Sequence, residues 1–237
     1  NIFSRIFVKD KEHGMPYLAA SDTVLANIET GRFLSKKQAQ TLKNLILKRD
    51  WILITCSGTL GNVTYTNKTF ENHIATHDLI RVVPNDNKVN KGTLYAFLSG
   101  RYGYNQITQS QFGGVVKHIN DEQTKAILVP VFPAAFQQEV DDLIQESARL
   151  REEATDALDK AHTLLLSSFE NKDTNIKAVS IRKIYAAHNQ RFEATYYSSS
   201  NRSIYDSIIE KYEFLRLKDL CSSIFRPGIF KRQYVSE

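Results

Sequence analysis

The most regular pattern of hydrophobic and polar positions lies in residues 136–169, a stretch with neither Gly nor Pro. Apolar and small side chains recur there at steps of three and four, which is typical of one face of an α-helix. These positions are Val140, Leu143, Ser147, Leu150, Ala154, Ala157, Ala161, Leu164 and Ser168. The pattern predicts one helix of about 34 residues, roughly 50 Å long at 1.5 Å per residue.

We call this narrow apolar stripe the seam. A long helix with so narrow a stripe is expected to find nothing local to bury it against, so it needs a partner helix from elsewhere in the chain or from another subunit. The Ala and Ser positions of the seam would let that partner approach closely. The alternative is that the helix packs on its own domain.

Shorter patterns in residues 1–133 predict a mixed α and β domain. We expect a helix over 36–48 that starts with a capping box of Ser35 and Gln38, and a second helix over 92–100. Strands are predicted at 51–55, 62–66, 77–83 and 113–119, and Pro130 and Pro133 predict an extended exit. The predicted fold class is therefore α+β, a compact head followed by one long coiled-coil-forming helix. A short helix is expected at about 201–213.

Composition adds few restrictions. The chain has 237 residues, 42% of them hydrophobic and 24% charged, which is ordinary for a folded globular protein. Two distant cysteines, Cys56 and Cys221, argue against a disulfide scaffold or a cysteine zinc site and suit a reducing compartment. The longest lightly charged stretch, at 126–136, carries two prolines and is far short of the roughly 20 residues that cross a bilayer.

Charge is distributed unevenly behind a net value of +5. Residues 1–133 hold 16 basic and 10 acidic side chains, residues 134–170 hold 3 and 9, and residues 171–237 hold 12 and 7. A basic head indicates a polyanionic partner, whereas an acidic helix should stand away from phosphates and bind protein instead.

The two ends of the chain resemble each other. GIFKRQYVSE at 228–237 aligns with NIFSRIFVKD at 1–10, with identities that include Phe230 over Phe3 and Arg232 over Arg5. This similarity predicts a repeat of which the chain holds one full unit and the opening of the next.

Residues 100–114, GRYGYNQITQSQFGG, interleave aromatic, amide and basic side chains. Amides can bind adenine bidentately in the major groove, Arg can bind guanine, and hydroxyl and aromatic groups can contact the sugar–phosphate backbone. The stretch is therefore a candidate DNA-binding segment, with a plain polar surface loop as the alternative. The candidate residues are Arg101, Tyr102, Tyr104, Gln106, Gln109 and Gln111.

Two further segments are candidates for DNA contact. The turn Gly58-Thr59-Leu60-Gly61 is too short for a P-loop, but its backbone N–H groups could face a phosphate, and we include Ser57, Thr59 and Asn62. The alternative is a purely structural turn. Lys36 and Lys37, in a basic group with Lys43, Lys48 and Arg49, suit contact with phosphates rather than with bases.

No pattern indicates catalysis or a metal site. His73 and His77 have the spacing of a helical metal pair, but the Glu of a zinc-protease motif and a third ligand are missing, and the segment looks like strand. Ser57 does not lie in the turn motif of a serine hydrolase, and no acid–base partner can be assigned to it. We therefore predict no catalytic residue and no metal.

Several motifs in this order resemble the specificity subunit of Type I restriction-modification systems. They are HGMPYLAASDT at 13–23, ILITCSGTLGNV at 52–63, HDLIRVVP at 77–84, GTLYAFLSGRYGYNQI at 92–107, the VPVFP exit into QQEVDDLIQESARLREEA, and RFEATYY followed by RLKDLCSSIFRPGIFKRQYV. In that family two target-recognition domains are separated by long helices that pair antiparallel, and each domain reads half of a split DNA sequence.

The resemblance implies an assignment for each part of the chain. Residues 1–133 would be a target-recognition domain, residues 134–170 the spacer helix, and residues 171–237 a linker and the lead-in to a second recognition domain. The implied partners are double-stranded DNA, methyltransferase subunits and, through them, the restriction subunit, in a prokaryotic cytoplasm and with no membrane. Self-association through the helix is a further expectation.

The resemblance also bears on catalysis. S-adenosylmethionine, ATP and Mg²⁺ would bind the partner subunits, so this chain would carry no cofactor and would be no enzyme itself. The alternatives are the recognition region of a single-chain restriction–methylation enzyme, a structural coiled-coil adaptor, and a nuclease or hydrolase with its own active site.

Overall fold

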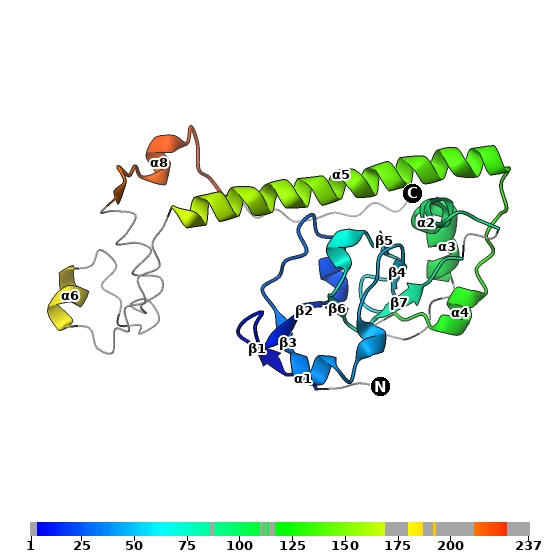
Figure 1. The fold of residues 1–237 in the computed structure, drawn as a ribbon, viewed down its shortest axis with the longest axis horizontal. Helices are drawn as coiled ribbons and strands as arrows, with labels where there is room; N and C mark the ends of the chain where they lie inside the picture. Colours follow the sequence, from blue (N-terminus) through cyan, green and yellow to red (C-terminus); the bar gives the residue numbers. More distant parts are fainter. Residues whose placement is uncertain are drawn as a thin grey trace. The chain divides into compact units, whose positions relative to one another are not determined.

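A computed structural model describes residues 4–85, 88–109, 111, 113, 117–168, 180–186, 192 and 211–226. The chain divides into two compact units, Asn1–Lys160 and Ala161–Glu237. The first unit contains both the predicted head and most of the long helix (Figure 1). The predicted fold class is confirmed, because mixed strands and helices are followed by one long helix.

The first sheet of the head has four strands in the order β1-β3-β2-β6. Strands β1 (Phe7–Val8), β2 (Gly14–Leu18) and β3 (Phe33–Ser35) are antiparallel neighbours, while β6 (Ile74–Ala75) pairs parallel with β2. The 3₁₀ helix η1 (Ala20–Val24) follows β2, and α1 (Lys36–Ala39) follows β3.

The second sheet has three antiparallel strands in the order β5-β4-β7. They are β4 (Ile52–Thr55), β5 (Val63–Tyr65) and β7 (Leu79–Val82), close to the predicted strands at 51–55, 62–66 and 77–83. Central strand β4 is buried on both faces, since Ile52 and Ile54 join one hydrophobic cluster and Leu53 joins another. The two clusters make this sheet the middle layer of the head.

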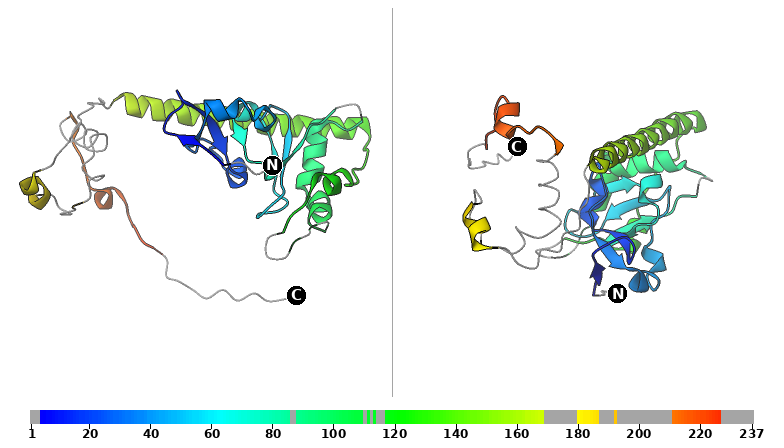
Figure 2. Two further views of the ribbon diagram at one scale, coloured as in Figure 1. Left: turned by 90° about the horizontal axis from the view of Figure 1, so that it is seen from below. Right: turned by 60° about the vertical axis from the view of Figure 1, so that its left-hand side comes forward.

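Two helices cover one face of the second sheet (Figure 2). Helix α2 (Lys91–Ser99) matches the predicted helix over 92–100, and α3 (Arg101–Gln109) follows it after Gly100. At Gly103 an added Cβ would lie 2.4 Å from the carbonyl oxygen of Phe97, so only glycine lets α3 turn so tightly onto the end of α2. Leu98 of α2 and Ile107 of α3 are buried against β4. The short helix α4 (Asp121–Lys125) comes before the long one.

The long helix α5 spans Ala134–Ser167 and has 34 residues, as the seam pattern predicts. The expectation that it has nothing local to bury against is wrong for its first half. Ala148 is buried in the cluster that contains Ile52 and Ile54, and Ile144 packs against the same cluster. The alternative reading, packing on its own domain, is thus correct for one face of the helix.

The predicted helix over 36–48 is wrong. Helix α1 ends at Ala39, the 3₁₀ helix η2 covers only Lys43–Leu45, and the chain then runs extended, with Ile46 bridged to Ile74. Leu45 and Leu47, two residues apart, are buried in different clusters, a spacing that suits extended backbone and no helix. The capping box is wrong as well. Ser35 makes no side-chain cap, and Gln38 bonds instead to the backbone of Ser4 and Ile6.

Other predictions fall largely outside the described residues. In the predicted strand at 113–119 the structure describes a single bridge, Ser57 with His118. The repeat at 228–237 and most of the helix at 201–213 lie outside the described part. The second unit contains α6 (Ile181–Ala186) and α8 (Leu217–Leu220). Among the described helices none is both long and apolar enough to span a bilayer.

Candidate nucleic-acid interface

The loop between β4 and β5 carries the first candidate segment. Thr55 N–H donates to the carbonyl of Asn62 at 2.9 Å and Gly61 N–H donates to the carbonyl of Thr55 at 3.2 Å, which closes residues 56–61 into a compact turn. Gly58 has φ +75° and Gly61 has φ +86°, in the left-handed region that favours glycine. The turn leaves Thr59 exposed and Ser57 half-buried at the end of the hairpin.

Helix α3 packs directly against this turn. A Cβ on Gly61 would lie 2.9 Å from Cε2 of Tyr104 and 3.4 Å from Cγ2 of Thr108, so the tyrosine ring rests on the glycine backbone. Two segments that are 40 residues apart in sequence and were proposed separately therefore form one surface. We call it the hairpin–α3 surface, made of residues 57–62 and 101–109.

A third segment flanks the hairpin. Ser57 is bridged to His118, and Ile119 N–H donates to the carbonyl of Cys56 at 3.1 Å. Burial, with Asp78 nearby, raises the pKa of the Cys56 thiol, so this side chain is neutral beneath the surface. The turn is thus held on one side by α3 and on the other by residues 118–119.

The side chains of the hairpin–α3 surface match what a DNA-binding surface needs. Tyr102 is 76% exposed and Tyr104 46% exposed, while Arg101, Asn105 and Gln109 are also exposed. Exposed rings can stack or contact sugars, a guanidinium can bind guanine or phosphate, and amides can bind adenine. Gln111 is exposed just beyond the helix. The segment for which a plain polar loop was the alternative is a helix over Arg101–Gln109.

Gln106 differs from the other candidates because its amide is already used. Its Nε2 donates to the carbonyl of Leu128 at 3.0 Å and its Oε1 accepts from Leu128 N–H at 2.9 Å. This pair of bonds ties α3 to the strand-like exit before α5. Base reading by Gln106 would first have to break both bonds, so its contacts suit positioning of α3.

The basic candidates Lys36 and Lys37 are exposed on α1, beside β3 and on the other sheet of the head (Figure 1). The structure does not bring them next to the hairpin–α3 surface.

Several other basic side chains of the head are engaged in contacts within the protein. Lys48 lies over the ring of Trp51 at 5.9 Å, and Arg49 forms an ion pair with Glu152 of α5 at 3.4 Å. Arg81 also makes its contacts within the head, because its guanidinium donates to the backbone carbonyls of Leu79 and Ala75.

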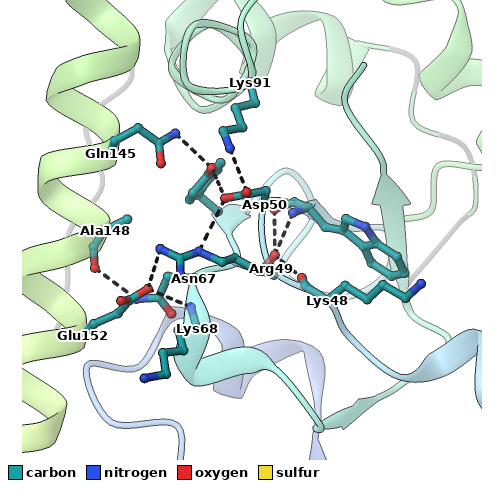
Figure 3. Close-up of polar contacts among 12 residues, drawn as sticks. Lys48, Arg49, Asp50, Asn67, Lys68, Lys91, Gln145, Ala148 and Glu152 are labelled. Carbon is teal, nitrogen blue, oxygen red and sulfur yellow. Dashed lines mark hydrogen bonds and ion pairs between the residues drawn. The ribbon is translucent and has the colours of Figure 1, made fainter. Parts of the chain in front are cut away.

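Besides the apolar contact of Ala148 and Ile144, head and long helix share polar contacts that the sequence pattern did not predict. Gln145 Nε2 donates to the Tyr65 hydroxyl at 3.0 Å, and that hydroxyl donates to Oδ1 of Asp50 at 2.6 Å (Figure 3). Lys91 Nζ donates to the other Asp50 oxygen at 2.7 Å. Asn67 Nδ2 donates to the carbonyl of Ala148 at 3.2 Å. In the sequence these residues look like ordinary polar positions exposed to solvent.

Further bonds extend the contact along α5. Glu152 Oε1 accepts from Lys68 N–H at 2.8 Å, and Asp141 Oδ1 accepts from Gly92 N–H at 2.6 Å. Gln137 is 5% exposed, and its Oε1 accepts from Asn90 N–H at 2.9 Å. We call the face of α5 that makes these contacts the docking stripe. It consists of Gln137, Asp141, Gln145, Ala148 and Glu152.

The protonation states of Asp50 and Tyr65 favour the hydrogen bonds of this network. Burial raises the pKa of Asp50, but the hydrogen bonds from Lys91 and Tyr65 outweigh it and leave the pKa below its usual range. Burial and the bond to Asp50 raise the pKa of Tyr65 well above that of a free tyrosine. At neutral pH an ionised Asp50 therefore accepts from a protonated Tyr65 and a charged Lys91.

The seam lies on another face of α5. Leu143 is 66% exposed, Leu150 50% and Leu164 73%, and Ala154, Ala157 and Ala161 are exposed as well. Val140 is half-buried. Ser147 and Ala154 border a cavity of about 450 Å³ between α5 and the segment after η1. The described residues thus leave most of the predicted seam open.

No group of three or more His, Cys, Asp or Glu side chains suited to a metal ion occurs among the described residues. His73 is buried in the loop before β6, with Nε2 3.6 Å from Oε1 of Glu29, whereas Nε2 of His77 lies 3.5 Å from Oδ1 of Asp78. The two histidines thus face different partners.

Comparison with known proteins identifies the head. Residues 4–149 match the family model of the Type I restriction modification DNA specificity domain. A similar solved structure is the S subunit of a Type I restriction-modification system from M. genitalium, at 13% identity and a TM-score of 0.38, over 70% of this chain and 39% of that one. The chain thus spans about two fifths of that subunit. A search of curated proteins found no match. Since the family model covers more than half of the sequence, the chain belongs to the family of Type I restriction-modification DNA specificity domains.

Proposed function

We propose that this chain reads one half of a bipartite DNA site through the hairpin–α3 surface and positions methyltransferase and restriction subunits on it. The observation that carries the proposal is the contact of Tyr104 with Gly61, because it joins two separate candidate segments into one surface with exposed aromatic and amide side chains and the guanidinium of Arg101. The basic balance of residues 1–133 favours the same partner.

Each candidate residue has a proposed role, and that of Gln106 is to position α3. Arg101, Tyr102, Gln109 and Gln111 would contact bases or the sugar–phosphate backbone, together with Ser57, Thr59 and Asn62 of the hairpin. Tyr104 both holds the hairpin and presents its ring. Lys36 and Lys37, on the other sheet, would contact phosphates at a distance from the bases.

The seam of α5 is the proposed site for a partner helix. Its exposed leucines and small residues suit coiled-coil pairing within a methyltransferase complex, in a prokaryotic cytoplasm. S-adenosylmethionine, ATP and Mg²⁺ would be bound by the other subunits. The recognition region of a single-chain enzyme has the same surface, and an upstream methylase motif in the parent gene would favour that alternative.

Duplex binding measured by fluorescence anisotropy over a salt series tests the proposal, with the methyltransferase subunit present. We expect Arg101→Ala to lower discrimination between specific and non-specific duplexes, by about 1–3 kcal/mol for a lost bidentate contact. Lys37→Ala should weaken binding to all duplexes alike and reduce the salt slope by about 1. The exposed Lys160→Ala on α5 is the control and should change neither.

Two outcomes would contradict this function. Duplex affinity that does not fall with rising salt would exclude a phosphate-contacting surface. Metal-dependent cleavage of DNA by the isolated chain would instead support a nuclease with its own active site.

A further inference from the structure

The docking stripe and the seam are two faces of one helix, and their relative angle follows from helical geometry. At about 100° per residue, the stripe and the seam are centred roughly 150° apart around α5. Because the head binds the stripe, the rotation of α5 on the head decides where the seam points. It also decides how the hairpin–α3 surface is oriented with respect to any helix bound to the seam.

We propose that the polar contacts of the docking stripe form a register lock, which holds α5 at one rotation and one axial position on the head and so sets the angle and distance between the DNA-reading surface and the partner helix. The proposal rests on the proposed function for its consequence in DNA reading. The lock itself is a property of this chain alone.

The contacts select one position because each needs a particular side chain. Gln145 meets a tyrosine hydroxyl, and Glu152 meets a backbone N–H and a guanidinium (Figure 3). Asp141 meets the first turn of α2. Hydrogen bonds depend on distance and angle, whereas apolar contacts tolerate sliding. Five positions spread over four turns of the helix must fit at once.

A slide of α5 by one turn breaks this fit in either direction. In one direction Arg149 replaces Gln145 at Tyr65, and Glu152 replaces Ala148 against the apolar cluster, which would bury an unpaired carboxylate.

In the other direction Asp141 replaces Gln145 and lies beside the Asp50 carboxylate, so that two like charges meet. Ala148 then replaces Glu152 and leaves Lys68 N–H and Arg49 without their acceptor. A shift by three residues would place Ile144 where Asp141 now binds Gly92 N–H.

Apolar contact alone would not select a position so sharply. On the helix, Ala148 is the buried member of the cluster with Ile52 and Ile54, and Ile144 is only partly buried there. Buried polar contacts that fix register at little gain in stability are known from coiled coils. The same principle applied within one chain explains why the polar residues of the docking stripe face the head.

Spin-label distances in the full chain test the lock. Labels at Lys125→Cys on α4 and Asp156→Cys on α5, with Cys56→Ser and Cys221→Ser, span a vector with a large component along α5, because α4 lies near the helix start (Figure 1). The lock variant is Gln145→Leu with Glu152→Leu. Its matched control is Gln138→Leu with Glu153→Leu, the same residue types at exposed positions.

We expect a single narrow distribution of label-to-label distances in the labelled chain with an unchanged docking stripe and in the control variant. The lock variant should broaden it or add a second distance displaced by about 5 Å, one helical turn. A narrow, unshifted distance in the lock variant overturns the proposal. Gln145→Leu and Glu152→Leu are also measured singly, so that the singles decide if the double variant does not fold. Glu152→Gln keeps an acceptor for Lys68 N–H, so it should keep the narrow distance distribution that Glu152→Leu loses.

A second measurement separates the lock from the proposed function. Assembled with its methyltransferase, the chain would modify sites of one spacer length, and the lock variant should accept spacers one base pair longer or shorter. If the spin-label distance changes in the lock variant while the spacer preference does not, the lock stands and its role in DNA spacing is wrong.

Discussion

The two faces of α5 reverse the usual relation between polarity and burial. On the docking stripe a glutamine, Gln137, is 5% exposed and hydrogen bonded, whereas on the seam Leu143 and Leu164 are 66% and 73% exposed. A surface helix of a globular domain normally turns its apolar side to its own core. The contact of α5 with the head therefore relies on hydrogen bonds that need one position, whereas the exposed apolar area of the seam is the surface for which we propose a partner helix.

The largest effect should follow from placing a charge on the docking stripe. Ala148→Arg puts a guanidinium into the cluster with Ile52 and Ile54, and we expect it to lower the free energy of unfolding by about 3 kcal/mol or more. Urea denaturation followed by the fluorescence of the single tryptophan, Trp51, measures it. The matched seam variant Ala157→Arg should change stability by less than about 0.5 kcal/mol. Equal losses in both would abolish the distinction between the faces.

Polar substitutions on the seam should leave the stability of the head unchanged and weaken binding to a partner. Leu143→Asn with Leu150→Asn removes two exposed leucines, so we expect unchanged denaturation of the head but association with the methyltransferase subunit weakened roughly tenfold or more. Sedimentation velocity of the mixture, and of the chain alone for self-association, measures this. Undiminished association would mean that the seam is not the docking face for a partner.

A single bond across the docking stripe should matter less. Asn67→Ala removes the donor to the Ala148 carbonyl and the side-chain cap of η3 (Lys68–Phe70), and should cost about 1–2 kcal/mol. The exposed Asn105→Ala on α3 should leave the urea midpoint unchanged. A neutral result for Asn67 would show that the docking stripe is held by apolar contact after all.

The smallest effects concern pH. The lowered pKa of Asp50 gives stability that is present above about pH 4 and is lost as pH falls, and the raised pKa of Tyr65 gives stability that is present below about pH 10 and is lost as pH rises. Because the Asp50 side chain is 34% exposed, solvent screening keeps its effect within about 1 kcal/mol.

Denaturation midpoints across pH separate the two groups. Asp50→Asn should flatten the acid limb of the stability profile and Tyr65→Phe the alkaline limb, while the exposed Glu139→Gln should leave both limbs as they are. If the pH profile of stability were unchanged in Asp50→Asn, the Asp50 carboxylate would contribute nothing to the network that binds α5.

The elements predicted from sequence are those with a strong local pattern. Helix α5 and strand β4 follow from uninterrupted periodicity and from an apolar run bounded by turn residues. The helix over 36–48 failed because Leu42, Leu45 and Ile46 fit a helical stripe, while pairing of Ile46 with Ile74 and burial of Leu47 favoured extended backbone. Local spacing cannot show a partner that lies 28 residues away.

The candidate site was only partly predictable. Residue types marked the hairpin and residues 101–109, but nothing in the sequence placed Tyr104 on Gly61, since that contact depends on how α3 turns at Gly103. Helix α3 itself was missed because its Gly, Asn and Thr residues are weak helix formers and its packing on α2 decides the outcome. The docking stripe was missed because Gln, Asp and Glu at helical spacing read as a solvated face.

The acceptors that α5 provides to α2 have a consequence for synthesis. Asn90 makes no side-chain cap, and the first turn of α2 bonds instead to Gln137 and Asp141, almost fifty residues downstream. A nascent chain that ends near residue 133 lacks these acceptors and lacks Ala148 over the β4 cluster. We therefore expect the head to complete its folding only after α5 has emerged, and a chimaera that exchanges heads should carry the helix at least as far as Glu152.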